Sequence, residues 1–505
     1  MFFKSLQLFF NLKVTILQKF YITTAIDYVN AKPHIGHAYE KIIADVLARY
    51  HRLFGDDVFF LTGTDENAQK NVKAAREAGI PVKDFVDKNS KVFVELCKKL
   101  NISYDDFIRT TERRHVKVAQ EIFKILLNKG FIYKGEYSGL YCTGCEEFKT
   151  EKDLVDGLCP EHKTEPEFLS EEAYFFKLSK FKNQILKLLK ENLVIPESRR
   201  NEMISRLENE ELKDLCVSRK GVKWGINVPG DDEHKIYVWI DALTNYLSGI
   251  DYPNEKFKRY WPADVHVIGK GINWFHSVIW PALLMAADIE IPKKIFVHGY
   301  VNIAGEKISK SLGNIVDPIE LTEKYGPDVL RYYLIREIPF GEDGDFSEKH
   351  LVARYNNELV ENYSNLFYRV TYFIKTRFNG KVPEPDEFDE EDKQILEKIK
   401  STIADVRKQI ENFNINSALE LVLDLCASTN RYFQKKEPWK GKRAETTLFV
   451  SINAIKAIQI LLSPFLPETS DKALKALNIE KDWEKIADFI EPGHEIEPLI
   501  LFRKI

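Results

Sequence analysis

Residues 20–53 read FYITTAIDYVNAKPHIGHAYEKIIADVLARYHRL, and this stretch decides the fold. The apolar run at 20–24 predicts a buried strand, and the apolar spacing of residues 38–53 predicts a helix. The histidine signature PHIGH, at 33–37, therefore lies on a strand-to-helix turn. A helix start of this kind offers unpaired N–H groups and a positive dipole end to phosphate. The stretch predicts a nucleotide-binding α/β domain.

The histidine signature carries three candidate nucleotide contacts. His34 and His37 can add ring N–H donors to the phosphates. Gly36 has no Cβ, so a flat ring or a backbone segment can approach it closely. A histidine-glycine-histidine turn alone is common on protein surfaces, so this motif needs a second one to support it.

The second motif is the lysine signature KISKS, at 307–311, about 270 residues later. Its ammonium groups, on Lys307 and Lys310, can meet the negative charge that builds up on a departing pyrophosphate. Alone, this motif is typical of a surface loop. Together and in this order, the two signatures predict a site that activates a carboxylic acid with ATP.

The composition agrees with a large intracellular enzyme of three or four domains. The chain has 505 residues, a formal charge of −4 and six unevenly spaced cysteines. The cysteines do not form a disulfide framework, so we expect a reducing, cytoplasmic compartment. The charge gives no overall attraction to nucleic acid, so any RNA surface must be a local patch. No apolar run reaches the ~18 residues of a membrane span, and we expect no membrane partner.

Two Cys/His pairs predict a zinc site. Cys142 and Cys145 are separated by two residues, as are Cys159 and His162. Pairs of this spacing on turns bring three thiolates and one imidazole together in a tetrahedron, which suits zinc. Because protein ligands fill all four positions, the zinc is expected to be structural, with one ion per chain. The other three cysteines have no such partners and are expected in the core.

Further segments predict a parallel sheet of the Rossmann type, interrupted by the zinc segment. Strands are expected at 58–63, 265–270 and 295–300, a helix at 274–287, and a strand or strand end at 236–243. Ligands in such sheets bind at the carboxyl ends of the strands. Asp65 follows one strand, where it either contacts a ligand or caps a helix.

The chain resembles the class I aminoacyl-tRNA synthetases, and within them the methionyl-tRNA synthetase family in its single-zinc form. The histidine and lysine signatures are similar to those of the class, with Ile308 in the usual Met place and LGN following at 312–314. The isoleucyl, valyl and leucyl enzymes carry a much larger insertion than residues 135–224 can hold. The other motifs that carry the resemblance are YITT (21–24), YVN (28–30), TGTDE (62–66), AYFF (173–176), WGINVP (224–229), VWIDA (238–242), GK (269–270) and FH (275–276).

The resemblance implies ATP-dependent attachment of L-methionine to tRNA(Met) through methionyl-adenylate, for initiation and elongation of translation, with Mg²⁺-ATP as substrate. His34, His37, Lys307 and Lys310 would be catalytic, and the ATP site would comprise His34, Gly36, His37, Gly269, Lys307, Ser309 and Lys310. The methionine pocket would comprise Ala25, Ile26, Tyr28, Asp65, Trp239, Ala242, Leu243, Tyr246 and His276.

The residue types of this pocket are chemically sensible for methionine. Aromatic rings contact a thioether favourably, and the Asp65 carboxylate would hold the ammonium group. The sequence departs from the family at Asn67-Ala68, where His-Gly often follows the Asp-Glu pair. This difference puts in doubt any contact made by those two positions.

Residues 351–505 predict a helix bundle. Amphipathic stretches at 351–376, 391–412, 416–434, 445–463 and 469–477 support it. The resemblance makes this bundle the reader of the CAU anticodon, through Asn365, Arg369 and Trp439. One helical turn places Asn365 and Arg369 on one face, and Trp439 lies within a basic stretch at 435–443 that suits a tRNA backbone.

The expected domain order follows from these assignments. It comprises an extension of no assigned role (1–19), the first half of the Rossmann-type domain (20–134), the insertion with the zinc knuckle (135–224), the second half (225–300), the lysine loop and linker (301–350) and the helical anticodon-binding domain (351–505). We expect a monomer. Two alternatives stay open: a descendant that keeps the fold and RNA binding without catalysis, and a related class I enzyme for cysteine, whose zinc contacts the substrate.

Overall fold

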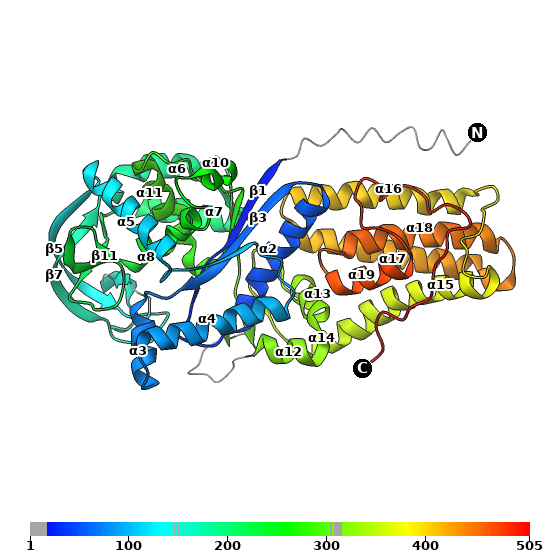
Figure 1. Cartoon of the computed structure of the whole chain (residues 1–505), viewed down its shortest axis with the longest axis horizontal. Coiled ribbons are helices and arrows are strands. Elements are labelled where there is room, and N and C mark those ends of the chain that lie inside the picture. Colours follow the sequence, from blue (N-terminus) through cyan, green and yellow to red (C-terminus); the bar gives the residue numbers. More distant parts are fainter. Residues whose placement is uncertain (1–17, 146, 150, 304–305, 308–315) are drawn as a thin grey trace.

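A parallel sheet forms the centre of the N-terminal half of the chain (Figure 1). The computed structural model describes residues 18–145, 147–149, 151–303, 306–307 and 316–505. Seven strands make the sheet, in the order β2-β3-β1-β13-β14-β8 with β4 paired to β3, and every pairing is parallel. The strands are β1 (Lys19–Thr24), β2 (Asp27–Tyr28), β3 (Asp57–Asp65), β4 (Asp106–Arg109), β8 (Val194–Ile195), β13 (Val265–Gly269) and β14 (Ile295–His298). This arrangement confirms the predicted Rossmann-type fold.

Alternate residues of the central strands pack on opposite faces of the sheet. Phe20 and Ile22 of β1 join one hydrophobic core with helix α2, whereas Tyr21 joins another with α5, α8 and α11. Both faces are therefore covered, which explains why the strands read as continuous apolar runs. The helices of this half are α2 (Ile35–Leu53), α3 (Gln69–Glu77), α4 (Val82–Lys99), α5 (Arg113–Asn128), α8 (Val238–Leu243), α9 (Asn245–Ser248), α10 (Glu255–Tyr260), η3 (Lys270–Ile272), η4 (Phe275–Ile279) and α11 (Trp280–Ala286).

The insertion between the two halves of the sheet is built around a long antiparallel pair, β5 and β7, seen at the far end of the molecule from the helix bundle (Figure 1). Its elements are β5 (Ile132–Cys142), β6 (Glu147–Lys149), η1 (Glu151–Asp153), β7 (Glu167–Phe176), η2 (Leu178–Phe181), α6 (Lys182–Lys190), α7 (Glu197–Asn209), β9 (Leu215–Cys216), β10 (Ser218–Lys220), β11 (Asn227–Val228) and β12 (Asp231–Ile236).

Two details of this region differ from the expected layout. Val194–Ile195 pairs with β14, so the chain returns briefly to the parallel sheet within 135–224. The prediction of a strand or strand end at 236–243 holds only for Ile236, which ends β12, and was wrong for residues 238–243, which form helix α8. A short apolar run has the same pattern in a strand and in a helix that is buried on all sides, and every residue of α8 is buried.

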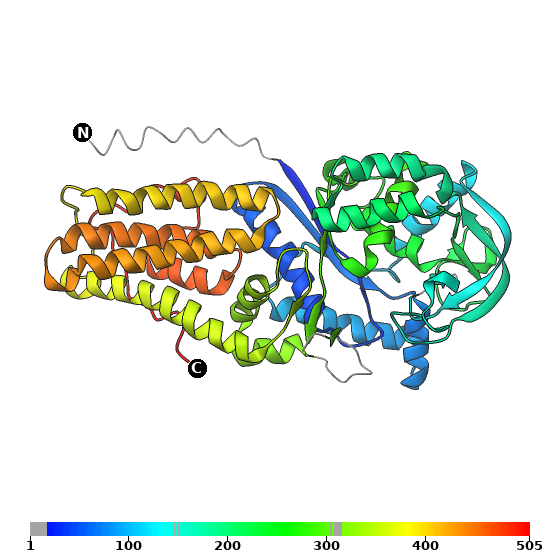
Figure 2. The same cartoon turned by 180° about the vertical axis from the view of Figure 1, so that it is seen from behind.

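The C-terminal half is a helix bundle, as predicted. Figure 2 shows its long helices side by side, on the other side of α2 from the insertion. A small sheet and two helices lead into it. The elements are β15 (Val301–Ile303), β16 (Glu306–Lys307), β17 (Gly344–Asp345), α12 (Pro318–Tyr325), α13 (Pro327–Glu337), α14 (Glu348–Arg354), η6 (Tyr355–Ser364), α15 (Asn365–Arg377), α16 (Glu390–Glu411), α17 (Ile415–Lys436), η7 (Pro438–Lys440), α18 (Ala444–Leu462) and α19 (Pro467–Ala476).

Helix α18 lies at the centre of the bundle. Among the residues described, it is the one helix whose length and composition would allow it to cross a membrane. However, 94% of its apolar window is buried inside the protein. Its apolar character is therefore explained by packing against α16, α17 and α19.

A buried ion pair joins the two halves. Arg331 of α13 and Asp45 of α2 are both fully buried, and their side chains approach to 2.7 Å. Arg331 also donates to the carbonyl oxygens of Leu100, Pro464 and Phe465. Burial alone would raise the pKa of Asp45, but Arg331, Arg49 and hydrogen bonds from Ser103 outweigh it, and the pKa lies below its usual value. The pair therefore fixes α2 against the bundle.

We expect Arg331→Met to destabilise the protein by ~3–5 kcal/mol, because it takes one of two cationic partners from the fully buried Asp45 carboxylate and leaves it with Arg49 alone. Urea denaturation followed by circular dichroism measures this loss. Lys393→Met is the control, because Glu390, the partner of Lys393, is 82% exposed, and its denaturation midpoint should stay unchanged. Equal midpoints for the wild type and Arg331→Met would contradict this role.

Candidate active site

A cavity of about 570 Å³ opens at the carboxyl edge of the parallel sheet. It collects side chains from the turn after β1, the start of α2, the end of β3, helices α8 and α9, and the segments after β13 and β14. All nine residues predicted to bind methionine line it, namely Ala25, Ile26, Tyr28, Asp65, Trp239, Ala242, Leu243, Tyr246 and His276. Four of the residues predicted to bind ATP line it too, namely His34, Gly36, His37 and Gly269.

The histidine signature caps helix α2 at the edge of this cavity. His34 is the N-cap, and its Nδ1 accepts a hydrogen bond from the Gly36 N–H at 3.1 Å. His37 Nδ1 accepts from the His34 N–H at 3.0 Å. A neutral imidazole whose Nδ1 accepts a hydrogen bond carries its proton on Nε2. Each ring therefore carries its N–H on Nε2.

Local packing explains the residue types of the signature. The two imidazole rings stack with centroids 3.8 Å apart. A Cβ at Gly36 would lie 3.0 Å from the His34 ring, so a larger residue would push that ring away. Burial, followed by the neighbouring His34 ring and the lysines at 41 and 70, lowers the pKa of His37 well below its usual value. His37 is therefore a neutral donor at physiological pH.

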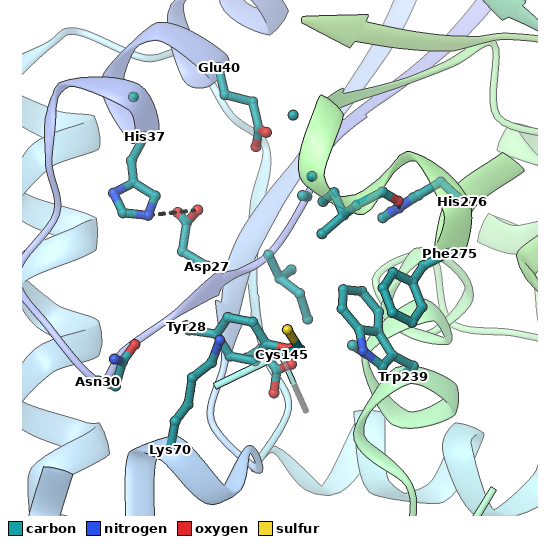
Figure 3. Close-up of a pocket in the computed structure, with 18 of the residues that line it drawn as sticks. Asp27, Tyr28, Asn30, His37, Glu40, Lys70, Cys145, Trp239, Phe275 and His276 are labelled. Carbon is teal, nitrogen blue, oxygen red and sulfur yellow. Dashed lines mark hydrogen bonds and ion pairs between the residues drawn. The ribbon is translucent and has the colours of Figure 1, made fainter. Parts of the chain in front are cut away.

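A buried charged cluster under the histidines escaped the sequence analysis. Lys41 Nζ lies 2.6 Å from Asp27 Oδ2, and His298 Nε2 lies 3.1 Å from Glu40 Oε2. Figure 3 shows Asp27 facing His37, whose Nε2 lies 3.9 Å from Asp27 Oδ1. Burial raises the pKa of Asp27 to about 7, against the opposing effect of Lys41. The available signal was the charged pair at positions 40 and 41, in the otherwise apolar first half of α2.

Aromatic rings form the other wall of the cavity. Trp239 and Phe275 stack with centroids 3.5 Å apart and an interplanar angle of 9° (Figure 3). The Tyr246 hydroxyl donates to His276 Nε2 at 2.7 Å, and His276 Nδ1–H donates to the Ile272 carbonyl at 3.0 Å. Burial lowers the pKa of His276 to about 4. This wall is therefore apolar and uncharged, which suits a thioether.

The end of β3 adds the carboxylate of Asp65 to the cavity. Asp65 is 2% exposed and lines the cavity. Its Oδ1 accepts the Asn67 backbone N–H at 3.3 Å. Nearby, the Lys70 ammonium lies over the Tyr28 ring, 3.0 Å from its centroid. The cavity thus combines the Asp65 carboxylate, an aromatic wall and a helix start that favours phosphate.

The four predicted zinc ligands converge at the rim of the same cavity. The ligand atoms of Cys142, Cys145, Cys159 and His162 all lie within 4.8 Å of one another. A Cβ at Gly144 would lie 2.4 Å from the His162 ring, so the close approach requires glycine. Three sulfur atoms and one imidazole nitrogen are the donor set of a structural zinc site, and the residues present fit that ion.

The lysine signature is described only in part. Lys307 ends strand β16, with its backbone paired to Asn302 of β15. Ser309 and Lys310 lie outside the described residues. Gly269, the remaining predicted ATP contact, ends strand β13 at the cavity.

The predicted anticodon residues come together at the far end of the bundle. Asn365 and Arg369 lie one turn apart on α15. The Arg369 guanidinium lies 5.0 Å from the Phe433 ring centroid and 5.8 Å from that of Trp439. Arg377 donates to the carbonyls of Pro438 and Trp439, which ties η7 to α15. An exposed amide, a guanidinium and an indole thus lie on neighbouring elements.

Part of the basic stretch at 435–443 has a structural role. Lys436 Nζ lies 2.5 Å from Asp389 Oδ2, and its side chain is only 9% exposed. Arg443 pairs with Asp392 at 2.7 Å. These two cations hold the start of α16, so fewer charges of the stretch can face RNA than the sequence analysis expected.

Comparison with known proteins gives consistent matches over both halves. The family described as tRNA synthetases class I (M) matches residues 20–166 and 162–371, and the anticodon binding domain of methionyl tRNA ligase matches 382–505. The methionine--tRNA ligases of Thermotoga maritima and Brucella suis are 44% and 43% identical to the chain. These alignments cover 96% and 94% of this chain, and 80% and 94% of the relatives.

A solved structure agrees with these sequence matches. The complex of Mycobacterium tuberculosis methionyl-tRNA synthetase with methionyl-adenylate has a TM-score of 0.94 and 40% identity, covering 96% of this chain and 99% of that chain. The matches favour the methionyl family over the cysteine enzyme that the sequence analysis left open.

The low pKa of His276 predicts a loss of stability in mild acid. Because the unfolded chain binds this proton near pH 6.5 and the folded chain only near pH 4, stability falls as the pH drops between these values. Between pH 7 and pH 5, this residue should cost about 2 kcal/mol. Urea denaturation at both pH values should therefore show a smaller loss in His276→Asn than in the wild type. The same loss in both proteins would refute this assignment.

Proposed function

This chain belongs to the methionyl-tRNA synthetase family, and we propose from this that its cavity joins L-methionine to ATP and passes the methionyl group to tRNA(Met). The observation that carries the proposal is the pairing of two features in one cavity. The start of α2, with its two histidines, and an aromatic wall with the buried Asp65 carboxylate line the same cavity.

In the first step, a methionine carboxylate oxygen attacks the α-phosphorus of Mg²⁺-ATP. An O–P bond forms, the bond to the β-phosphate oxygen breaks, and pyrophosphate leaves with the electron pair. We propose that Asp65 holds the methionine ammonium group and that the wall of Trp239 and Tyr246 surrounds the thioether. Substrate positioning supplies much of the rate.

The histidines and lysines would stabilise the charge that moves onto the phosphates. We propose that His34 and His37 donate their Nε2–H groups to these oxygens, because their Nδ1 atoms already accept backbone N–H groups. Lys307 and Lys310 would act on the leaving pyrophosphate. No side chain has to form a covalent bond to the substrate.

In the second step, a hydroxyl of the terminal tRNA ribose attacks the carbonyl carbon of methionyl-adenylate. The new ester bond forms as the carbon–oxygen bond to AMP breaks, AMP leaves with the electron pair, and the hydroxyl proton passes to the released AMP phosphate or to water. We propose that Asn365, Arg369 and Trp439 read the anticodon at the other end of the molecule, where a base can stack on the indole. We also propose a monomer in the cytoplasm, where reducing conditions keep the six cysteines from forming disulfides.

We propose that Cys142, Cys145, Cys159 and His162 hold one structural zinc ion, which organises the knuckle beside the cavity. The support is the donor set and its convergence. Because four protein ligands close the coordination sphere, the ion would take no part in methionine activation.

Zinc content tests this assignment. The purified protein should contain one zinc per chain by mass spectrometry, and Cys159→Ser should lose most of it, because a hydroxyl is a poor zinc ligand. Cys216→Ser is the control, since Cys216 is buried outside the cluster. Full zinc retention in Cys159→Ser, or loss in Cys216→Ser alone, would contradict the site.

Charging of tRNA tests the complete function. The wild type should attach methionine to tRNA(Met) and lose this activity when the CAU anticodon is changed. Trp439→Ala should lower kcat/KM for tRNA by about tenfold to a hundredfold, because base stacking on an aromatic ring is worth ~1–3 kcal/mol. Trp439→Phe should keep most of the activity.

Pyrophosphate exchange needs no tRNA, so it distinguishes a loss of tRNA recognition from a loss of folding. Methionine-dependent exchange of pyrophosphate into ATP should be unchanged in Trp439→Ala, because η7 lies outside the cavity. An equal loss in charging and in exchange would mean that the variant damages the whole protein, and no loss in charging would exclude Trp439 from tRNA recognition.

A further inference from the structure

Asn67, which stands where the sequence departs from the family pattern, makes a buried contact across the fold. It follows β3 and is 8% exposed. Its side-chain Nδ2 donates to Asp241 Oδ2 at 2.7 Å and to the Thr110 carbonyl at 3.3 Å. The side chain at position 67 is therefore a hydrogen-bond donor with defined partners. The sequence alone assigned it no role.

Asp241 is the centre of a fully buried polar network. It lies in α8, and its Oδ1 is 2.6 Å from His115 Nε2 of α5. His115 Nδ1 lies 2.9 Å from Ser248 Oγ of α9. The side chains of His115 and Asp241 are 0% exposed. An ionised carboxylate only accepts hydrogen bonds, so Asn67 and His115 must both act as donors toward it.

The network connects two walls of the cavity without lining the cavity itself. On one side, the Asn67 backbone N–H donates to Asp65 Oδ1. On the other side, Asp241 lies in the same short helix as Trp239 and Ala242, which line the cavity. None of Asn67, His115 and Asp241 is among the described residues that line it. The network would therefore affect a bound substrate only indirectly, through the positions of the cavity walls.

We propose that Asn67 is a positioning residue for methionine, which acts through Asp241 by fixing the spacing between the Asp65 carboxylate and the aromatic wall of α8. This inference rests on the proposed function and deepens it. Both ends of an amino acid must be held at once, so a small change in this spacing weakens its binding.

Only another hydrogen-bond donor can replace asparagine in its contact with Asp241. An apolar side chain of similar size, as in Asn67→Leu, would leave Asp241 Oδ2 buried with one donor fewer. A buried acceptor that loses its partner is costly, so the carboxylate and α8 would shift to recover a hydrogen bond. Asn67→His places a ring N–H donor at this position. Histidine is also the residue type that the family pattern often has there.

Pyrophosphate exchange with methionine tests the proposal. We expect Asn67→Leu to raise the KM for methionine about tenfold or more, the size expected for a hydrogen bond to a charged group. The KM for ATP should change less than about threefold, because the start of α2 is untouched. Asn67→His should return the KM for methionine to within about threefold of the wild type.

Asn453→Leu is the matched control. Asn453 is a buried asparagine of the bundle, whose amide donates to the Phe449 carbonyl and accepts from the Ile490 N–H. Its replacement should lower the melting temperature and leave the KM for methionine unchanged. If Asn67→Leu fails to fold, Ser248→Ala probes the far end of the network and should raise the same KM by a smaller factor.

The outcomes separate this inference from the proposed function. An inactive, folded wild type would refute the proposed function. An active wild type with unchanged KM for methionine in the folded variants Asn67→Leu and Ser248→Ala would overturn the positioning role alone. Equal rises in the KM for methionine and for ATP, or a failure of Asn67→His to recover, would also overturn it.

Discussion

The start of helix α2 must lie at the carboxyl edge of the sheet with its donors directed outward, and the rest of the structure depends on this constraint. The body of α2 is buried between the sheet and the bundle, so its direction is set by packing. Its first turn is capped by His34 and His37 through their Nδ1 atoms. The cap therefore orients the same groups that we propose bind phosphate.

Helix α2 also connects the cavity to the helix bundle. Halfway along α2, Asp45 pairs with Arg331, which in turn holds the turn between α18 and α19. At the other side of the cavity, the Asp241 network joins α5, α8 and α9 to the end of β3. Buried polar contacts of this kind specify one arrangement, because every alternative leaves a charge without a partner. The cavity is thus held by contacts outside its lining.

Much of this fold was predictable because the signals are local. The parallel strands, the Cys/His pairs and the amphipathic helices each follow from the spacing of neighbouring residues. Helix α8 was mispredicted because a buried helix and a buried strand share an apolar run.

The pairing of Asp27 with Lys41 and of Asn67 with Asp241 depends on contacts distant in sequence. Likewise, the basic stretch at 435–443 was assigned to the tRNA backbone, because the acidic partners of Lys436 and Arg443 at the start of α16 are distant in sequence. The roles of the individual site residues were inferred from the family resemblance. The spacing of residues in the sequence would not have given these roles.

The central claim is that this cavity activates methionine with ATP before any tRNA is bound. Exchange of labelled pyrophosphate into ATP, measured with each of the twenty amino acids in turn and without tRNA, tests it most directly. We expect exchange with methionine and with none of the other nineteen, and loss of this exchange in a folded His34→Asn protein, because asparagine can cap α2 but has no imidazole Nε2–H to offer the phosphates. Exchange with a different amino acid, or none in folded, zinc-loaded wild type, would contradict the account.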